Sequence, residues 1–383
     1  MPVKKKIVLV GPAYPYRGGN SLYVSFLYDL LKDYYDVKVV NYKLLYPSIL
    51  FPGTTQNDVS GHILKEVKST RLINSVNPFS WFKTANFIKN LNADLVIFDW
   101  WNPFFGPSHR MISQLIRKKY KNRIVFITEN VISHEARFID RFLTKIGLKN
   151  ADCFIALSKV VEETLKNYAD KKIYRSALPV YDCYNLEKGI DSNEQKKELG
   201  YNENDLVILF FGYVRKYKGL NVLIDAMPQI LRNHENTKLL IVGEFYDSPG
   251  RYIEQIKNLN LENYVKIVQR FVPNEEVEKY YSAADIVVLP YLSATQSGVL
   301  NIAYGFQKPV IVTDVGGLAE DVIEGKTGYI VAPDSPRAIT EAVEKFDNAK
   351  DKTDYKKNIE EKLKDNLFSK FPSLIEEILN TNK

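Results

Sequence analysis

The chain has 383 residues, of which 45% are hydrophobic and 26% charged, with a formal net charge of +6. This composition is typical of a soluble globular protein, and no uninterrupted apolar run approaches the length that a membrane-spanning helix needs. The length exceeds that of one ordinary hydrophobic core and predicts two domains, each of roughly 150 to 200 residues.

The first half of the chain alternates short apolar runs with amphipathic stretches. Strands are expected at Ile7–Val10, Val37–Val40, Leu95–Phe98, Ile124–Thr128 and Phe154–Leu157. Helices are expected at Ser21–Lys32, Trp81–Leu91, Ser108–Lys119 and Glu135–Lys149. Fully apolar strands that alternate with helices predict a parallel sheet covered on both faces. The long irregular segment Lys43–Asn77 is typical of a functional or mobile loop.

The second half repeats this pattern. Strands are expected at Val207–Phe211, Leu239–Val242, Val265–Val268, Ile286–Leu289 and Val310–Thr313. A polar stretch between the halves predicts a hinge near Leu186–Asn193. We therefore expect an α/β protein with an N-terminal domain over residues 1–185 and a C-terminal domain over residues 194–353. The charged helical segment 354–383 is expected to pack back on the first domain. Two doubly wound sheets facing a cleft would gather the carboxyl ends of their strands around one site.

Cysteine content and charge distribution bear on location and partners. Two cysteines, Cys153 and Cys183, without a secretory context indicate reduced thiols and a cytoplasmic protein. Residues 1–180 hold 27 Lys+Arg against 14 Asp+Glu, a net charge of +13, and the remainder has −7. A cluster of basic residues comprises Arg117, Lys118, Lys119, Lys121 and Arg123. It indicates either contact with anionic lipid at the inner face of the cell membrane or a solvated helix end. Nucleic acid is not expected, because no recognition motif accompanies the basic residues.

Four clusters of polar or glycine residues follow predicted strands. The first, Gly11–Asn20, holds Gly18 and Gly19 at the start of a helix. Its spacing is not Gly-x-Gly-x-x-Gly, which argues against a dinucleotide site. The paired glycines either bring backbone amides against a phosphate or form a plain strand-to-helix turn.

The second cluster is Phe211–Leu220, with Arg215 and Lys218 before a helix. Two fixed cations at a strand end stabilise negative charge on a departing diphosphate. The alternative is a solvated basic turn. No His, Asp or Glu cluster has metal-ligand spacing, so no metal is expected.

The third cluster, Thr128–Glu135, follows a strand of the first half and offers Glu129 and His134. Glu129 is expected to hydrogen-bond a donor or acceptor hydroxyl, or to act as a base toward the acceptor. Alternatively, Ser133 and Glu135 merely begin the next helix, as a cap and a first-turn acid.

The fourth cluster lies between the strands Ile286–Leu289 and Val310–Thr313, where a short helix begins near Gly298. A glycine there allows close approach of a ligand, and the first-turn amides suit a diphosphate. The residues expected to bind a donor are Thr295, Gln296, Ser297, Gly298, Val299, Leu300 and Glu320. For Glu320 a helix cap is the favoured alternative.

The pattern Gly212-x-x-x-x-x-Lys218-Gly219 and the block 283–322 closely resemble family-4 glycosyltransferases, the group 1 retaining enzymes with the GT-B fold. The resemblance implies a metal-independent hexosyltransferase with a nucleotide-diphosphate sugar as donor and no further cofactor. Its acceptor would be a glycan or lipid-linked saccharide in cell-envelope polysaccharide synthesis. Relatives often have a histidine where Glu129 stands and an arginine where Tyr213 stands.

The sequence departs from this family where a pair of glutamates is usual. An ungapped count places that pair on Ala294 and Ile302, neither of which has a side chain that accepts a hydrogen bond. The donor's base and sugar are therefore not predicted. Two alternatives stay open: a non-catalytic scaffold partner of an active glycosyltransferase, and a nucleotide-sugar epimerase of the same shape.

Overall fold

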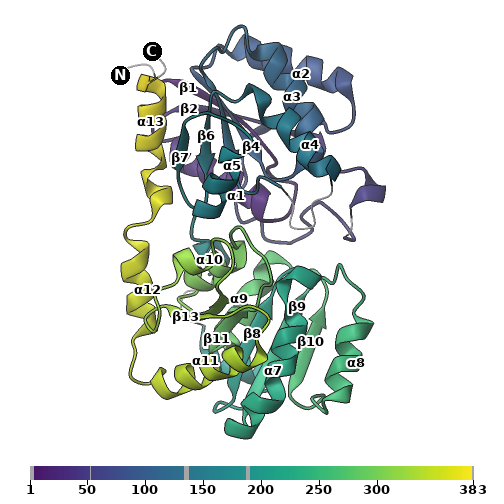
Figure 1. Cartoon of the computed structure of the whole chain (residues 1–383), viewed down its shortest axis with the longest axis vertical. Coiled ribbons are helices and arrows are strands. Elements are labelled where there is room, and N and C mark those ends of the chain that lie inside the picture. The colour runs from purple at the N-terminus through teal and green to yellow at the C-terminus, as the bar shows by residue number, and fades with distance from the viewer. Residues whose placement is uncertain (1–3, 52, 133–137, 187–189, 382–383) are drawn as a thin grey trace. The chain divides into compact units, whose positions relative to one another are not determined.

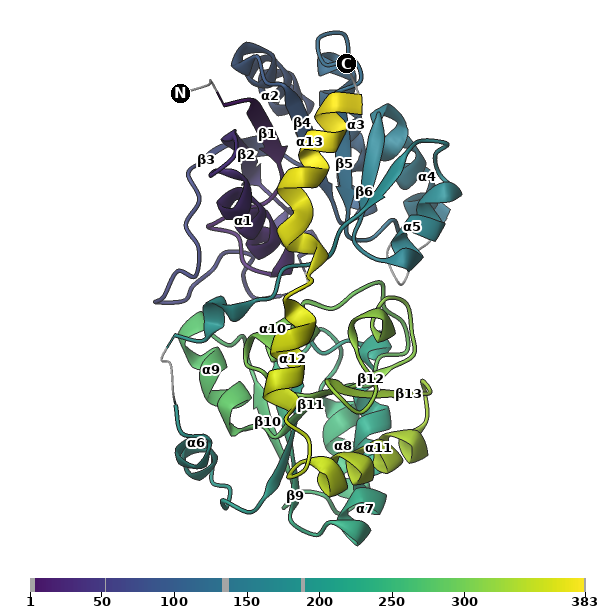
Figure 2. The ribbon, with the colours of Figure 1, turned by 90° about the vertical axis from the view of Figure 1, so that its left-hand side faces the viewer.

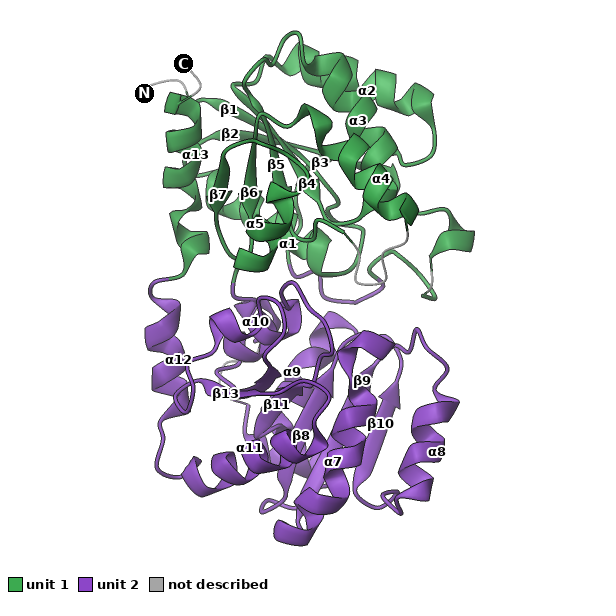
Figure 3. Cartoon of the chain, viewed as in Figure 1, with its two compact units in different colours: residues 1–58, 65–179, 366–383 green, residues 59–64, 180–365 purple. Residues whose placement is uncertain are grey.

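The computed structural model describes residues 4–51, 53–132, 138–186 and 190–381 (Figure 1). The chain divides into two compact units (Figure 3). Unit 1 comprises Met1–Asp58, Lys65–Pro179 and Asn366–Lys383, and unit 2 comprises Val59–Leu64 and Val180–Asp365. Part of the segment expected as a hinge, residues 187–189, lies outside the described residues.

Unit 1 contains a parallel sheet with the strand order β3-β2-β1-β4-β5-β6-β7. Its strands are β1 (Lys6–Val10), β2 (Asp36–Leu44), β3 (Ser69–Asn74), β4 (Leu95–Trp100), β5 (Ile124–Thr128), β6 (Cys153–Ala156) and β7 (Ile173–Arg175). Its helices are α1 (Gly19–Leu31), α2 (Pro78–Leu91), α3 (Gly106–Ile116), α4 (Phe138–Gly147), α5 (Lys159–Lys166) and α13 (Phe371–Thr381). Its 3₁₀ turns are η1 (Ser48–Leu50), η2 (Pro103–Phe105), η3 (Leu148–Asn150) and η7 (Leu367–Lys370).

The five strands expected in the first half are confirmed. Every residue of β4 and β5 is buried, as the apolar runs indicate. The expectation of one irregular segment over Lys43–Asn77 is wrong, because β2 continues to Leu44 and β3 lies inside that segment. Few side chains of an edge strand are buried, and in β3 only Ile73 is. The sequence of β3 therefore has no apolar run that would predict a strand.

The tail expected to pack as one element is divided between the units. Helix α13 packs on unit 1, where Phe371, Ile375 and Ile378 join the apolar cluster beneath α1, and Tyr35 Oη donates to Pro372 O at 3.1 Å (Figure 2). Helix α12 (Tyr355–Leu363) belongs to unit 2. The segment 354–383 therefore contributes to both cores.

Unit 2 repeats the topology with the order β10-β9-β8-β11-β12-β13, again parallel. Its strands are β8 (Leu206–Phe211), β9 (Thr237–Gly243), β10 (Val265–Gln269), β11 (Ile286–Leu289), β12 (Val310–Thr313) and β13 (Gly328–Val331). Its remaining helices are α6 (Ser192–Glu198), α7 (Leu220–Asn233), α8 (Gly250–Asn258), α9 (Asn274–Ala283), α10 (Gly298–Gly305) and α11 (Pro336–Ala349). Its 3₁₀ turns are η4 (Asp182–Tyr184), η5 (Lys216–Lys218) and η6 (Ala319–Asp321).

Two segments join unit 2 from positions that the sequence pattern places elsewhere. The chain passes into unit 2 at Val180, before the expected hinge, and Tyr181 N donates to Asn301 O at 3.3 Å. Residues 59–64 of the long loop also belong to unit 2, where Gly61 N donates to Glu275 Oε1 at 2.9 Å. Unit 2 is therefore built from two separate stretches of the chain, residues 59–64 and 180–365.

Both sheets reverse their strand order at one point. In unit 1 the chain lays β2 and β3 on one side of β1 and then returns to add β4 on the other side. In unit 2 the same reversal occurs between β8 and β11. Doubly wound sheets bind ligands at the carboxyl ends of the strands at this switch point. The loops after β1, β4, β8 and β11 are therefore where functional side chains are sought.

Candidate functional site

The loop that follows β8 is fixed against the end of β11. Gly219 has φ 64°, and a β-carbon added there would overlap the carbonyl oxygen of Pro290. Leu292 N also donates to Tyr217 O at 2.7 Å. These contacts hold η5, and with it Lys218, at the switch point of unit 2.

Lys218 is a buried cation without a carboxylate partner in the described part of the chain. Its side chain is buried, and Nζ lies 5.2 Å from the ring centroid of Tyr291. Among the described residues, no carboxylate or carbonyl group accepts a hydrogen bond from its ammonium. Burial lowers the pKa of Lys218, Tyr217 opposes this shift, and the charge of Arg215 lowers the pKa further. A buried charge is costly unless paired, so this position favours an anionic ligand.

Arg215 stands at the rim of the same loop. Its guanidinium carbon lies 4.8 Å from the ring centroid of Tyr246, which packs in turn against Tyr213 in a tilted arrangement at 4.8 Å between centroids. In the part of the chain that the structure describes, Arg215 has no carboxylate partner. The aromatic contacts hold the side chain while its N–H groups stay available to an anion.

Helix α10 presents its first turn to Lys218. Gly212, at φ 102°, lies under both: a β-carbon added there would be 3.3 Å from Lys218 Nζ and 3.2 Å from Val299 Cγ2. Ser297 is the N-cap of the helix, and its Oγ accepts from Leu300 N at 3.4 Å. Leu300, expected to offer its amide to a ligand, therefore gives it to the cap. The amides of Gly298 and Val299 keep no intrahelical acceptor.

The remaining donor candidates of unit 2 have different environments. Gln296 Oε1 is buried and has no hydrogen-bond donor among the described residues, so it is poised to accept one from a ligand. Thr295 is half-buried beside it. Glu320 is exposed within η6, whose cap position is Leu318, so a capping role is wrong.

The two positions that depart from the family pattern are buried. Ala294 is covered by the turn at Gly316, because a β-carbon on Gly316 would overlap the carbonyl oxygen of Ala294. Ile302 lies on α10 and is 9% exposed. Both side chains are apolar, and neither provides a polar contact to a ligand.

In unit 1, Gly18 and Gly19 open α1 without a side-chain cap. Gly18 has φ 104°, and a β-carbon added at either glycine would have nothing within 4 Å. Both residues are exposed. Exposed amides beside open space allow a ligand to approach this helix end closely.

Glu129 follows β5 and lies next to Asp99, the penultimate residue of β4. Both side chains are buried, and Glu129 also accepts a hydrogen bond from Asn20 in the first turn of α1. Burial raises the pKa of Glu129 to about 7, although the hydrogen bonds from Asn20 and Asp99 lower it. Burial, followed by the charge of Glu129, raises the pKa of Asp99 well above its usual range. His134, the other candidate of this cluster, lies outside the described residues, as do Ser133 and Glu135.

Comparison with known proteins identifies the family. Residues 191–364 match the model of glycosyl transferases group 1. An uncharacterized glycosyltransferase of Methanocaldococcus jannaschii is 26% identical over 88% of this chain and 87% of that protein. D-inositol 3-phosphate glycosyltransferase of Corynebacterium jeikeium is 30% identical over 51% of this chain and 49% of that protein. The chain is a glycosyltransferase, and its residues 191–364 belong to group 1.

Solved structures agree on the fold of this glycosyltransferase. Anabaena HepE in complex with UDP-glucose aligns with a TM-score of 0.74 at 18% identity, over 98% of this chain and 99% of that one. Sucrose-phosphate synthase of Thermosynechococcus elongatus aligns with a TM-score of 0.70 at 21% identity, over 99% and 98%. These likenesses confirm two Rossmann-like domains of the GT-B type.

The described residues of the glycosyltransferase hold neither a membrane-spanning helix nor a cluster of metal ligands. None of its helices there is long and apolar enough to cross a membrane. No group of three or more His, Cys, Asp or Glu side chains in the same residues is arranged to hold a metal ion.

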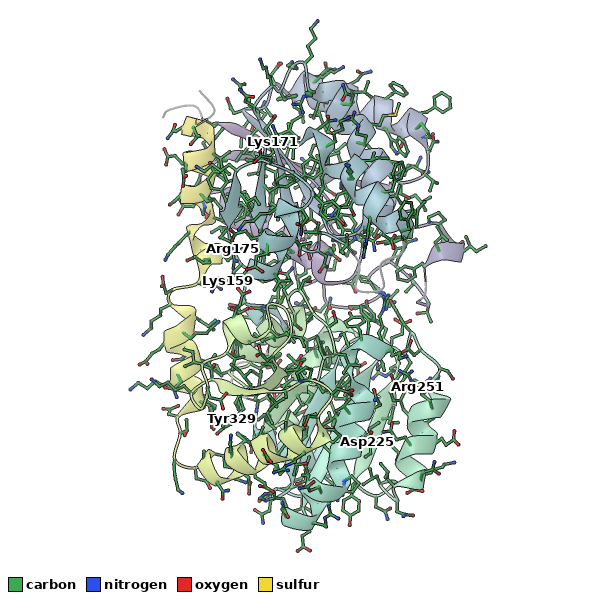
Figure 4. The ribbon with its side chains drawn as sticks, viewed as in Figure 1. Lys159, Lys171, Arg175, Asp225, Arg251 and Tyr329 are labelled. Atoms are coloured by element: carbon green, nitrogen blue, oxygen red, sulfur yellow. The ribbon has the colours of Figure 1, made fainter. Side chains whose placement is uncertain are left out.

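Several cations of unit 1 already have structural roles. In the cluster of basic residues at 117–123, Arg117 donates to Asn150 O at 3.0 Å, and Lys119 Nζ donates to Lys89 O at 2.6 Å. Figure 4 shows Lys171 and Arg175 at opposite ends of β7, with Lys159 at the same end as Arg175. Arg175 Nη1 lies 3.6 Å from Glu162 of α5. These contacts support the fold of the glycosyltransferase.

Sequence reasoning missed Asp99 and Asn20. The signal for Asp99 is an acid inside the otherwise apolar run Leu-Val-Ile-Phe-Asp-Trp at a switch-point strand. A carboxyl group there is costly unless it has a partner, which marks the position as functional or networked. Asn20 carries no such signal, because an asparagine in a first helical turn is common at surfaces.

Proposed function

We propose that this glycosyltransferase moves a hexose, with retention of anomeric configuration, from a nucleotide-diphosphate sugar to a glycan or lipid-linked saccharide. The acceptor would belong to cell-envelope polysaccharide synthesis. The observation that carries the proposal is the buried, unpaired ammonium of Lys218 beside the first turn of α10. Binding of UDP-glucose by the structurally similar HepE supports a donor of this class.

The proposed chemistry assigns the departing diphosphate to unit 2. Lys218, Arg215 and the amides of Gly298 and Val299 stabilise the negative charge that develops as the sugar leaves. Donors fixed in advance stabilise that charge without reorganising, which is the largest single contribution in many enzymes. With two cations and two amides on the diphosphate, the proposed reaction needs no divalent metal.

The other candidates orient the sugars. Gln296 and Thr295 are assigned to the transferred sugar, because Gln296 Oε1 needs a donor and sugar hydroxyls supply one. Glu129 in unit 1 is assigned to the acceptor side, and Gly18 and Gly19 stay candidates for donor binding. His134 and Glu320 stay candidates for donor contact on the sequence pattern alone.

Calorimetry with nucleotides tests this proposal. We expect UDP, GDP or ADP to bind at least about tenfold more tightly than the matching monophosphate, because a charge-assisted hydrogen bond contributes roughly 1.5–3 kcal/mol. A panel of UDP, GDP and ADP sugars with product analysis then identifies the donor. Absence of binding by every nucleoside diphosphate would favour the scaffold alternative. Conversion of a donor sugar to its epimer without an acceptor would favour the epimerase.

A second proposal concerns contact of unit 1 with an anionic membrane through helix α4. Three large apolar side chains of this helix are exposed: Phe138 at 89%, Ile139 at 56% and Phe142 at 54%. Exposed basic residues share the helix and its end: Arg141, Lys145 and Lys149. Apolar side chains beside basic ones favour the interface of an anionic bilayer.

Liposome flotation tests the membrane contact. The protein should float with vesicles that contain phosphatidylglycerol and stay behind with neutral vesicles at low salt, since each basic residue near the surface contributes about 1 kcal/mol. The double substitution Phe138→Ser and Phe142→Ser should abolish flotation. Ile253→Ser, which changes an exposed apolar residue of α8, is the matched control. Equal recovery with both lipids, or with both variants, would exclude the proposed surface.

A further inference from the structure

The carboxyl groups of Asp99 and Glu129 occupy the switch point of the unit 1 sheet. Asp99 lies over Gly11 at the end of β1: a β-carbon added at Gly11 would be 3.0 Å from Asp99 Cβ and 3.6 Å from Asp99 Oδ2. Glu129 N donates to Trp100 O at 2.9 Å, which fixes the start of the loop after β5 beside the end of β4. Asp99 is 4% exposed and Glu129 6%. Both groups are therefore held by backbone that has little freedom to move.

These carboxyl oxygens have too few donors for two negative charges. Both oxygens of Asp99 and Oε1 of Glu129 are buried and lack a hydrogen-bond donor among the described residues. The Asn20 side chain donates to Glu129. Otherwise each carboxyl group has the other within hydrogen-bonding reach. An ionised carboxylate has no hydrogen to donate, so the two can bond only if one is protonated.

We propose that Asp99 and Glu129 hold one proton between them, and that protonated Asp99 is the positioning residue that donates it to the carboxylate of Glu129. This hydrogen bond orients Glu129 and leaves its Oε1 free to accept a second hydrogen bond, from a hydroxyl group of the acceptor sugar. The assignment of that hydroxyl rests on the proposed function, whereas the shared proton does not.

The surroundings place the proton on Asp99. Glu129 has a hydrogen bond from Asn20, in the first turn of α1, and a helix N-terminus favours negative charge. Asp99 has no such donor among the residues that the structure describes. Tyr42 of β2 interacts electrostatically with Asp99; burial and then Asp99 raise the pKa of Tyr42 well above 10, so it stays neutral. His109 of α3 bonds Tyr42 Oη at 2.9 Å and is neutral as well, because burial lowers its pKa to about 3.

Carboxyl-selective ¹³C NMR of two Asp99 variants tests the pair without any substrate. Glu129→Gln assigns the Glu129 resonance. In the unaltered protein this resonance should titrate near pH 7, in line with the raised pKa of Glu129. Asp99→Asn keeps a hydrogen-bond donor to Glu129, so the Glu129 midpoint should stay within about half a pH unit of its value in the unaltered protein. Asp99→Leu removes the donor and should move it upward by about one pH unit or more, since a hydrogen bond to a charged group is lost.

Infrared spectroscopy supplies a second measurement that does not need Asp99→Leu to fold. A protonated-carboxyl stretch should be present at pH 8 in the unaltered protein and absent in Asp99→Asn. A Glu129 midpoint near the ordinary 4.5, equal midpoints in the two variants, or no such stretch would overturn the proposal.

Activity measurements separate the shared proton from the proposed function. With an identified donor, the acid limb of the kcat/KM profile should be unchanged in Asp99→Asn and should move to higher pH in Asp99→Leu. A merely structural role of Asp99 would lower activity in both variants without moving the limb, which would count against positioning. Absence of transfer with every donor would refute the proposed function and leave the NMR result standing.

Discussion

Replacing Lys218 with methionine should lower turnover by about 10²- to 10³-fold, the effect of removing one group that stabilises transition-state charge. Methionine keeps the length and apolar character of the side chain, so the packing on Tyr291 is retained. The loss should appear in kcat and in the affinity for nucleoside diphosphates, measured by steady-state kinetics and calorimetry. Lys218→Arg, which retains the charge, should recover part of the activity.

The same substitution should raise the melting temperature. Burial lowers the pKa of Lys218, so the charged form is less stable in the folded protein than in the unfolded chain. Its cost to stability is present below the folded pKa and disappears as the pH rises from the folded to the unfolded value. Methionine removes this cost at neutral pH, and each kcal/mol relieved corresponds to about 2–4 °C for a unit of this size.

A matched lysine separates this effect from a general loss of charge. Lys257, exposed on α8, has no place in the site, and Lys257→Met should change neither turnover nor melting temperature appreciably. A folded Lys218→Met protein with unaltered turnover would remove Lys218 from the mechanism. A lower melting temperature would show that the ammonium has a stabilising partner.

Most of the fold follows from short apolar runs, and the exceptions have a common cause. Strands β4, β5, β8 and β11 are buried on both faces, so their positions select apolar residues, with Asp99 and Thr128 as the exceptions. Edge strands face less of the core. In β3 only Ile73 is buried, and in β7 only Tyr174, which leaves no run to recognise.

The unit 2 site is better anticipated than the unit 1 site, because its residues are close in sequence to glycines. Gly212 and Gly219 fix the loop that carries Lys218, and both occupy positive-φ conformations that glycine favours. Leu300 shows the limit of this reasoning. The pattern marks a helix start, but whether a first-turn amide is free depends on the cap, and Ser297 engages that of Leu300.

Spacing along the chain does not predict that Asp99 and Glu129 of unit 1 form a pair. Asp99 lies on β4 and Glu129, 30 positions later, directly follows the adjacent parallel strand β5, while Asn20 comes from a third segment. Strand order is required before these three are known to converge. Whether two acids repel or share a proton then depends on burial and on the donors nearby, which only the folded geometry provides.

Gly219→Ala should destabilise unit 2 by about 3 kcal/mol or more and also weaken diphosphate binding. A left-handed conformation costs a residue with a β-carbon about 1–2 kcal/mol, and a forced overlap in a packed region adds about 1–3 kcal/mol. At Gly219 the overlap is with the backbone oxygen of Pro290, which has no rotamer to change. Relief of the overlap must therefore move η5, and Lys218 with it, away from the first turn of α10.

Gly200→Ala provides the matched control for this substitution. Gly200 also has positive φ, 80°, but a β-carbon there would meet nothing within 4 Å, so only the conformational cost applies. Urea unfolding should therefore give about 1 kcal/mol for Gly200→Ala, with nucleoside diphosphate affinity unchanged. The difference between the two variants measures the contact between the β8 loop and the end of β11. Equal losses of stability, with diphosphate affinity intact in both, would mean that this contact does not position Lys218.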